Sequence, residues 1–249
     1  MSFADAEPAP TTVFRTALVE QEQMRLKGGI YHLTQVAFAY HSNRIEGSRL
    51  SEEQTRYLLD TRTVVGDALL DDVIAADNHF RAFAMMLRHV GQPITEDTLF
   101  GYHRALMEHV ADTHSGLLIA GAWKTRANTV GGVNTTPPLG VAYAVAELLH
   151  DAPERMSVED IVDWHVRFER IHPFQDGNGR VGRLVMFEQC LANDVVPFIV
   201  LEGRKTDYFA GLARYIEAPE LLRLELDAAQ TEYRQRFTPF LPTHREPAT

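Results

Sequence analysis

Residues 172–183 read His-Pro-Phe-Gln-Asp-Gly-Asn-Gly-Arg-Val-Gly-Arg, and the rest of the chain is best interpreted from this stretch. Gly177 and Gly179 flank an asparagine, and good helix formers follow, so a helix is expected to begin at this turn. Backbone N–H groups at a glycine-bounded helix N-terminus point outward together and bind anions. The stretch therefore predicts an anion-binding turn at the start of a helix.

The side chains of the same stretch add the chemistry of phosphate transfer. Arg180 and Arg183 lie three residues apart on one helix face, and guanidinium groups suit phosphate oxygens. Asp176 directly precedes the turn, where a carboxylate would hold Mg²⁺ against those phosphates. His172 is the one group in the stretch that accepts a proton near neutral pH, so it is predicted to be a general base. The order of residues matches neither a P-loop nor a dinucleotide-binding fingerprint.

This stretch resembles the signature of the Fic family, His-Pro-Phe-x-Asp/Glu-Gly-Asn-Gly-Arg-x-x-Arg, and every specified position is matched. The family usually transfers AMP from ATP onto a hydroxyl of a target protein. The resemblance implies that His172 deprotonates a Ser, Thr or Tyr of that target, that Asp176 holds Mg²⁺ or Mn²⁺, and that Phe174 anchors the loop. It implies phosphate contacts from five residues, which are Gly177, Asn178, Gly179, Arg180 and Arg183.

Two other functions stay open beside AMP transfer. Relatives move other nucleotide monophosphates, phosphocholine or a phosphate, and some glutamate-bearing relatives also remove the AMP adduct. A non-catalytic nucleotide-sensing module is the alternative outside enzymology, and it would predict a damaged signature. The intact Gly-Asn-Gly turn favours AMP as the transferred group.

A second motif lies upstream, where residues 42–47 read Ser-Asn-Arg-Ile-Glu-Gly. It is similar to the family's inhibitory element, Ser/Thr-x-x-x-Glu-Gly/Asn. By itself the pattern also describes a helix that ends at a glycine beside a solvated glutamate. Beside the complete signature, the resemblance implies that Ser42, Glu46 and Gly47 form an inhibitory helix end. The Glu46 carboxylate would pair with Arg183 and occupy the cation meant for the γ-phosphate.

Residues 121–138 break the helical pattern and combine β-branched residues with a Gly-Gly pair, which predicts a short hairpin. An ordinary loop between helices is the other interpretation. In the Fic family a hairpin before the signature holds the target segment as an added strand. The resemblance implies target docking by Lys124, Thr125, Arg126, Thr129 and Val130. Tyr208 falls where relatives often supply an aromatic near the adenine, with core packing as an equal alternative.

Composition limits the class of protein. The chain has 249 residues, of which 45% are hydrophobic, enough for one sizeable core. A net charge of −10 argues against binding to nucleic acid. Cys190 is the single cysteine, which fits a reducing compartment. No signal peptide pattern and no apolar run of about twenty residues is found, so we expect a cytoplasmic protein without a membrane partner. The expected partners are ATP and a target protein, and the resemblance implies a homodimer.

Apolar residues at three- and four-residue intervals predict an all-α fold with a small hairpin, as the resemblance also implies. Helices are expected over residues 30–45, 51–62, 68–90, 96–110, 140–150, 158–170, 178–193, 206–217 and 219–237. We expect four parts in the chain: a disordered N-terminus (1–13), an N-terminal helical segment with the inhibitory helix (14–94), a Fic domain core (95–217), and a C-terminal helix with a frayed tail (218–249).

Overall fold

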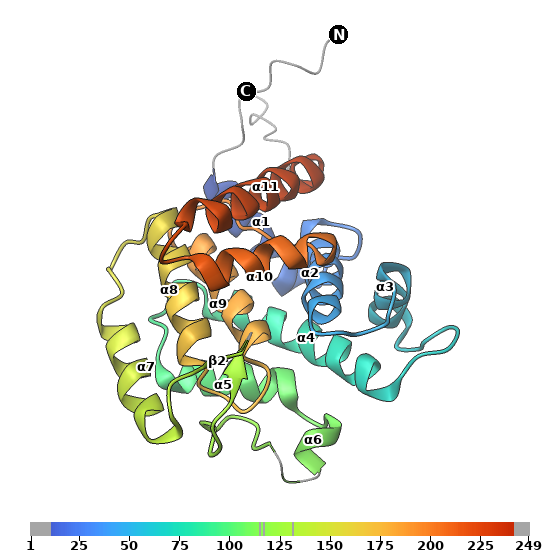
Figure 1. The fold of residues 1–249 in the computed structure, drawn as a ribbon. Helices are drawn as coiled ribbons and strands as arrows, with labels where there is room; N and C mark the ends of the chain where they lie inside the picture. The colour runs from blue at the N-terminus through green and yellow to red at the C-terminus, as the bar shows by residue number, and fades with distance from the viewer. Residues whose placement is uncertain (1–10, 115, 117, 131, 242–249) are drawn as a thin grey trace.

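The computed structural model describes residues 11–114, 116, 118–130 and 132–241, and it is built almost wholly of helices (Figure 1). In chain order they are α1 (Thr11–Met24), α2 (Ile30–Ile45), α3 (Glu52–Thr61), α4 (Leu70–His89), α5 (Glu96–Met107), α6 (Ala111–His114), α7 (Val141–His150), α8 (Val158–Ile171), α9 (Asn178–Ala192), α10 (Lys205–Arg214) and α11 (Pro219–Phe237). Short 3-10 helices are η1 (Pro138–Gly140), η2 (Glu202–Arg204) and η3 (Thr238–Phe240). The all-α prediction is confirmed.

Helix α9 runs through the centre of the molecule. It contacts α1, α2, α4, α5 and α8, and its residues from Arg180 to Leu191 are all buried. Phe187 packs against Phe38 of α2, Phe83 of α4 and Tyr233 of α11, with ring centroids 5.1, 5.6 and 5.8 Å apart. Because α9 is buried on every side, its N-terminus has a fixed position inside the bundle.

Helix starts follow the local sequence. Ser51, Thr95 and Ser157 cap α3, α5 and α8 by accepting a hydrogen bond from the backbone N–H three residues later, and the side chain at that position bonds back. Such capping boxes satisfy backbone N–H groups that a helix start otherwise leaves unpaired. The predicted helix boundaries agree with the structure within about three residues.

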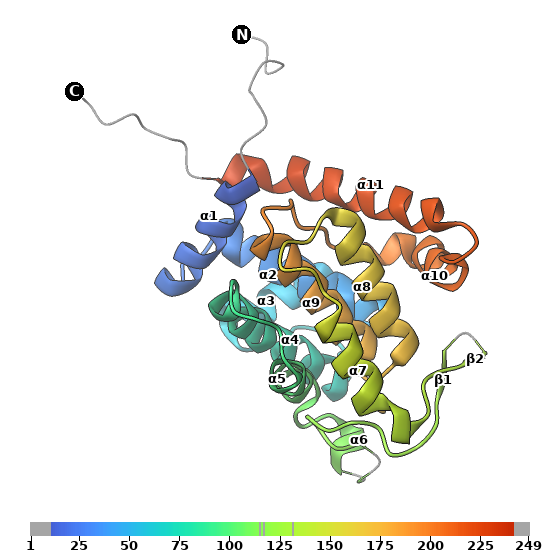
Figure 2. The same ribbon diagram turned by 90° about the vertical axis from the view of Figure 1, so that its left-hand side faces the viewer.

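The predicted hairpin is also present. Strands β1 (Thr129–Val130) and β2 (Val133–Asn134) pair antiparallel, with Val130 opposite Val133. The turn contains Gly132, whose φ of +79° suits glycine. Figure 2 shows the hairpin projecting from the helical body near α7.

The predicted N-terminal boundary needs a correction. Residues 11–13, expected to belong to a disordered end, begin α1, and residues 1–10 lie outside the described part of the chain. Phe14, Ala17 and Leu18 of α1 are buried in the core, so tertiary packing stabilises a helix whose sequence pattern is weak. The frayed tail is expected from Thr238 onward, but residues 238–240 form η3, and residues 242–249 lie outside the described part of the chain. No described helix is both long and apolar enough to span a bilayer.

Candidate active site

The signature forms the connection between α8 and α9. His172 ends α8 in the left-handed region (φ 50°, ψ 61°), and Gly177 precedes α9 with a φ of +78°. The Asn178 side chain closes this loop, since it accepts from the Phe174 N–H (2.7 Å) and donates to the Phe174 carbonyl (2.9 Å). Phe174 is fully buried, in agreement with its predicted anchoring role. The Asn178 side chain thus shapes the turn from inside, and its backbone N–H lies at the start of α9, where a helix binds anions.

His172 has the geometry of a base. Its Nδ1 lies 3.2 Å from the carbonyl of Glu169, an acceptor that requires the proton on Nδ1 and leaves Nε2 with its lone pair. The side chain is 18% exposed, so a substrate can approach it. Burial and the nearby Lys124 cation lower the pKa of His172, so the imidazole is neutral at pH 7.

Asp176 and Arg180 lie at the mouth of the turn. The Asp176 carboxylate is about half exposed and lies 3.1 Å from Nη2 of Arg180, whose own side chain is almost buried. No group of three or more potential metal ligands occurs in the described part of the chain. Mg²⁺ is often held by one or two carboxylates together with substrate phosphates, and the single exposed carboxylate of Asp176 fits that arrangement.

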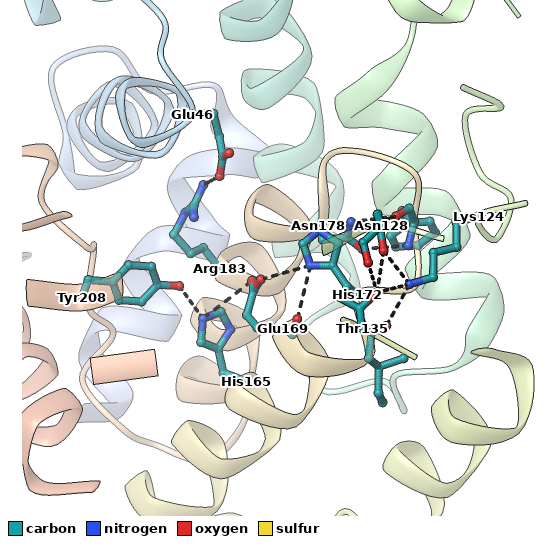
Figure 3. Close-up of polar contacts among 12 residues, drawn as sticks. Glu46, Lys124, Asn128, Thr135, His165, Glu169, His172, Asn178, Arg183 and Tyr208 are labelled. Atoms are coloured by element: carbon teal, nitrogen blue, oxygen red, sulfur yellow. Dashed lines mark hydrogen bonds and ion pairs between the residues drawn. The ribbon is translucent and has the colours of Figure 1, made fainter. Parts of the chain in front are cut away.

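Two of the predicted inhibitory residues, Ser42 and Glu46, contact Arg183, and Figure 3 shows the contact with Glu46. Nη2 of Arg183 lies 2.7 Å from Oε1 of Glu46 and 3.1 Å from the Ser42 carbonyl, and its Nε donates to Oγ of Ser42 at 3.1 Å. Arg183 is 1% exposed, whereas the Glu46 side chain is one-third exposed. Gly47 follows the end of α2 with a φ of +104°, which lets the chain turn away after Glu46.

Glu46 covers the anion-binding turn itself. A Cβ atom placed on Gly179 would lie 2.5 Å from Oε1 of Glu46 and 2.9 Å from Nη1 of Arg183. Burial alone would raise the pKa of Glu46, but Arg183 and Arg180 outweigh it and the pKa is lowered. The ionised carboxylate therefore stands where the helix N-terminus would receive a phosphate.

A cleft opens beside this carboxylate. Its lining includes Asn43 and Glu46 from the end of α2, Ala75 from α4, Met107 from α5, and Asp176 with Arg180 from the signature. The predicted metal ligand, a predicted phosphate cation and the predicted inhibitory glutamate therefore line the same cleft. A nucleotide that enters it would meet the anion-binding turn.

The structure corrects the prediction for Tyr208. Its side chain is fully buried and its hydroxyl lies 2.6 Å from Nε2 of His165, so it cannot form an exposed wall for an adenine. The alternative of core packing holds instead. The exposed aromatic of α10 is its neighbour Phe209, which is 44% exposed and packs against the Tyr208 ring.

The hairpin residues divide into two groups. Thr125, Arg126, Thr129 and Val130 are exposed, as docking of a target segment requires, and the Arg126 N–H donates to the Gln175 side chain at 3.2 Å. Lys124 departs from the prediction, because it is only 3% exposed and its ammonium group points into the protein. It cannot dock a target directly.

Sequence patterns missed two residues that support the site. His103 accepts from the Gly121 N–H through Nδ1 (2.8 Å), donates from Nε2 to the Asp176 carbonyl (3.0 Å) and stacks on Phe174. Glu169 lies beneath the base, with Oε2 3.9 Å from Nδ1 of His172. No spacing signal marks His103, because α5 is distant in sequence, whereas the position of Glu169 one helical turn before His172 could have indicated contact.

In this all-α bundle, the loop between α8 and α9 and the first turns of α9 bring together a histidine, a glycine-bounded helix start and two arginines, an arrangement that suits a phosphate-containing ligand. Residues 93–190 match the model of the Fic/DOC family, and the chain therefore carries a Fic domain.

Curated relatives and solved structures agree with this assignment. The chain is 27% identical over 180 residues to "Protein adenylyltransferase Fic" of Nematostella vectensis, an alignment that covers 68% of this chain and 40% of that protein. It is 25% identical over 201 residues to "Protein adenylyltransferase fic-1" of Caenorhabditis elegans, with 72% and 36% covered. The chain thus spans about two fifths of the length of these curated relatives.

Two crystal structures share the fold over almost the whole chain. A Fic domain containing signaling protein from Bacteroides thetaiotaomicron has a TM-score of 0.71 at 21% identity, covering 91% of this chain and 95% of that one. A Fic family protein from Desulfovibrio desulfuricans has a TM-score of 0.69 at 22% identity, with 96% and 78% covered. The shared fold extends well beyond the residues that match the family model.

Proposed function

We propose that this protein is an adenylyltransferase that moves AMP from ATP to a Ser, Thr or Tyr hydroxyl of a target protein. The observation that carries the proposal is the arrangement of one loop, in which a neutral His172 with a free Nε2 precedes an anion-binding turn followed by two arginines. The names of the curated relatives, which are adenylyltransferases, support the same activity.

The reaction would follow from these positions. Nε2 of His172 takes the proton of the target hydroxyl, the hydroxyl oxygen forms a bond to the α-phosphorus, and the bond from that phosphorus to the bridging oxygen breaks. Pyrophosphate leaves with the electron pair of that bond. The N–H groups at residues 177–179 and the cations of Arg180 and Arg183 would hold the phosphates and stabilise the charge that develops on them. Bound Mg²⁺ would supply charge neutralisation at Asp176.

Glu46 would hold the enzyme in an inactive state. Its carboxylate forms an ion pair with Arg183 at 2.7 Å and lies against Gly179 in the space of the phosphates. ATP that binds beside this carboxylate would lose the Arg183 contact and meet a like charge. Residues 42–47 would therefore act as an inhibitory element within the chain.

The setting belongs to the proposal as well. Cys190 is a buried free thiol and the sequence contains no second cysteine, which supports a reducing, cytoplasmic environment. The exposed strand β1 offers backbone groups to which a segment of a target protein would add as a further strand.

Intact-mass measurement tests the transfer activity and its inhibition by Glu46 together. Wild type, Glu46→Gly and the double variant Glu46→Gly/His172→Ala are incubated with MgATP. We expect self-modification by AMP units in the Glu46→Gly variant alone, because Arg183 is then available and the base is intact. A mass gain equal to one phosphate would show that the protein transfers phosphate and not AMP. The proposal would be contradicted if no sample gained mass and no protein in an added mixture of candidate targets gained mass either.

A further inference from the structure

Lys124 occupies a buried position between the hairpin and the signature loop (Figure 3). Its Nζ donates to Oδ1 of Asn128 at 2.7 Å, to Oγ1 of Thr135 at 2.6 Å and to the carbonyl of Ile171 at 3.3 Å. An ammonium group has three donors, and all three have an acceptor here. Asn128 precedes β1 and Thr135 follows β2, so one cation joins both ends of the hairpin to the residue before the base.

Further hydrogen bonds close the same connection. The Lys124 N–H donates to the Pro173 carbonyl at 2.8 Å, and the Asn128 amide donates to the Phe174 carbonyl at 3.2 Å. The Thr135 hydroxyl donates back to Asn128. The carbonyls on both sides of His172 in the chain are therefore bonded to the base of the hairpin.

The charge of Lys124 is not neutralised by an ion pair. Within the residues that the structure describes, no carboxylate lies within 4.0 Å of its Nζ, and all three acceptors are neutral. Burial lowers the pKa of Lys124 to about 8, so the group is still charged at neutral pH. Burying a charge without an ion partner is costly, which suggests that the charge has a use at this position.

From this geometry we infer that Lys124 is a positioning residue for the transfer reaction, which fixes the target-holding hairpin relative to His172 and places a positive charge beside that base. The inference rests on the proposed function. A target hydroxyl held on β1 reaches Nε2 of His172 only if hairpin and loop keep one relative position, and small displacements of reacting groups reduce rates strongly. The positive charge disfavours protonation of the imidazole and so keeps the base neutral.

The charged groups that face His172 come from four elements. They are Glu169 of α8, Lys124 before the hairpin, Glu46 at the end of α2 and Asp176 of the signature loop. Glu46 and Asp176 raise the pKa of His172, whereas Lys124 and burial lower it. Removal of the Lys124 charge is thus expected to raise the pKa of His172. The acid limb of the pH profile of the AMP transfer rate should then move to higher pH.

The test uses the Glu46→Gly protein as its parent, with Lys124→Met, Thr135→Val and Lys27→Met added singly. Lys124→Met keeps the length of the side chain without its donors, and Thr135→Val is the milder variant that removes one acceptor. Lys27 is the matched control, since its Nζ donates to a carbonyl at the surface and its side chain is 71% exposed. Three quantities are measured: hydrogen exchange of residues 125–138, the pKa of His172 by NMR titration, and kcat and KM for MgATP in self-modification.

We expect faster exchange of the hairpin in Lys124→Met and Thr135→Val, a raised pKa of His172 in Lys124→Met alone, and a kcat at least tenfold below the parent with KM for ATP unchanged. Lys27→Met should match the parent. Unchanged hairpin exchange in both variants would overturn the inference, as would a parental kcat despite a loosened hairpin. If the parent transfers no AMP, the proposed function has failed. Hydrogen exchange and the NMR titration then decide the role of Lys124 by themselves, with an unchanged pKa and unchanged exchange rejecting it.

Discussion

Glu169 is a residue near the base whose ionisation the fold strongly perturbs. Burial, with a smaller contribution from Glu46, raises the pKa of its carboxyl to about 7 from an ordinary value of 4.5, although Arg183 acts in the opposite direction. A group with a raised folded pKa contributes stability that is complete below its unfolded pKa and is lost as pH rises through the folded pKa. The window for Glu169 is therefore about pH 4.5 to 7.

Replacing Glu169 with Gln tests this assignment. Glutamine cannot ionise, so the variant avoids the cost of a buried carboxylate above pH 7. The free energy of unfolding of Glu169→Gln relative to wild type should rise between pH 5 and 8 by up to about 3 kcal/mol, since each pKa unit corresponds to about 1.4 kcal/mol. Urea denaturation at both pH values measures the change. An equal difference between the two proteins at both values would show that Glu169 titrates normally.

At position 179 the anion-binding turn requires glycine, because a side chain there would fill the space that the phosphates are proposed to occupy. In the Glu46→Gly background, Gly179→Ala puts a methyl group 2.9 Å from Nη1 of Arg183 and into the space of the phosphates. We expect MgATP to bind at least tenfold more weakly by calorimetry, while thermal stability is kept because alanine favours the helix. Gly203→Ala is the control, since its Cβ would meet no atom within 4 Å. Equal affinity in the two variants would place the phosphates elsewhere.

Among the elements, the C-terminal end of α2 is the one that carries regulation in this proposal. Arg44 holds it in place, because its Nη1 donates to the Ser48 carbonyl at 2.8 Å and its Nη2 to Oε1 of Glu202 at 3.2 Å. The Glu202 N–H also donates to Nδ1 of His41 at 3.2 Å. These contacts connect the turn that presents Glu46 to η2, just before α10.

Glu202→Gln should therefore loosen the inhibitory element without altering the site. The Arg44–Glu202 pair is about one-third exposed on both sides, and such pairs contribute about 0.2–1 kcal/mol. AMP transfer by the variant should rise about twofold to fivefold over wild type and stay below Glu46→Gly, as measured by AMP incorporated per protein. Glu53→Gln, at an exposed position of α3, is the control. AMP transfer at the wild-type level would show that the contact with η2 does not hold the inhibitory element in place.

At the scale of the whole molecule, α9 links the site to the core. Its N-terminus forms the anion-binding turn and its middle contributes Phe187, which three aromatic rings from other helices surround. Phe187→Ala should lower the free energy of unfolding by about 3–5 kcal/mol, because a large cavity opens between four helices. Phe240, which is 43% exposed in η3, is the control, and its replacement by alanine should cost about 1 kcal/mol or less. If urea denaturation showed similar decreases in the free energy of unfolding for the two variants, the central role of α9 in the core would be contradicted.

Much of the fold and site follows from local sequence. Apolar periodicity predicts α2 and α11 to the residue, a capping-box spacing marks the start of α3, and the signature indicates the proposed base and phosphate cations. These features are predictable because helix propensity, capping and turn conformation depend on residues close in the chain. Helix α1 is not predicted in this way, because its stability comes from the burial of its apolar residues against the core and not from its local sequence pattern.

What only the tertiary structure decided are the contacts between distant residues. Glu46 and Arg183 are separated by 137 positions, and their 2.7 Å ion pair exists because α2 packs beside α9. Lys124 is predicted to be an exposed hairpin cation, but it is buried against the signature loop. For Tyr208 the sequence leaves a ligand-facing aromatic and core packing equally open, and the structure shows it buried with its hydroxyl against His165. The sequence by itself determined which chemical groups are present and which helices form. Which of those groups face the site, and which hold it together, depends on packing over long distances, which no local pattern encodes.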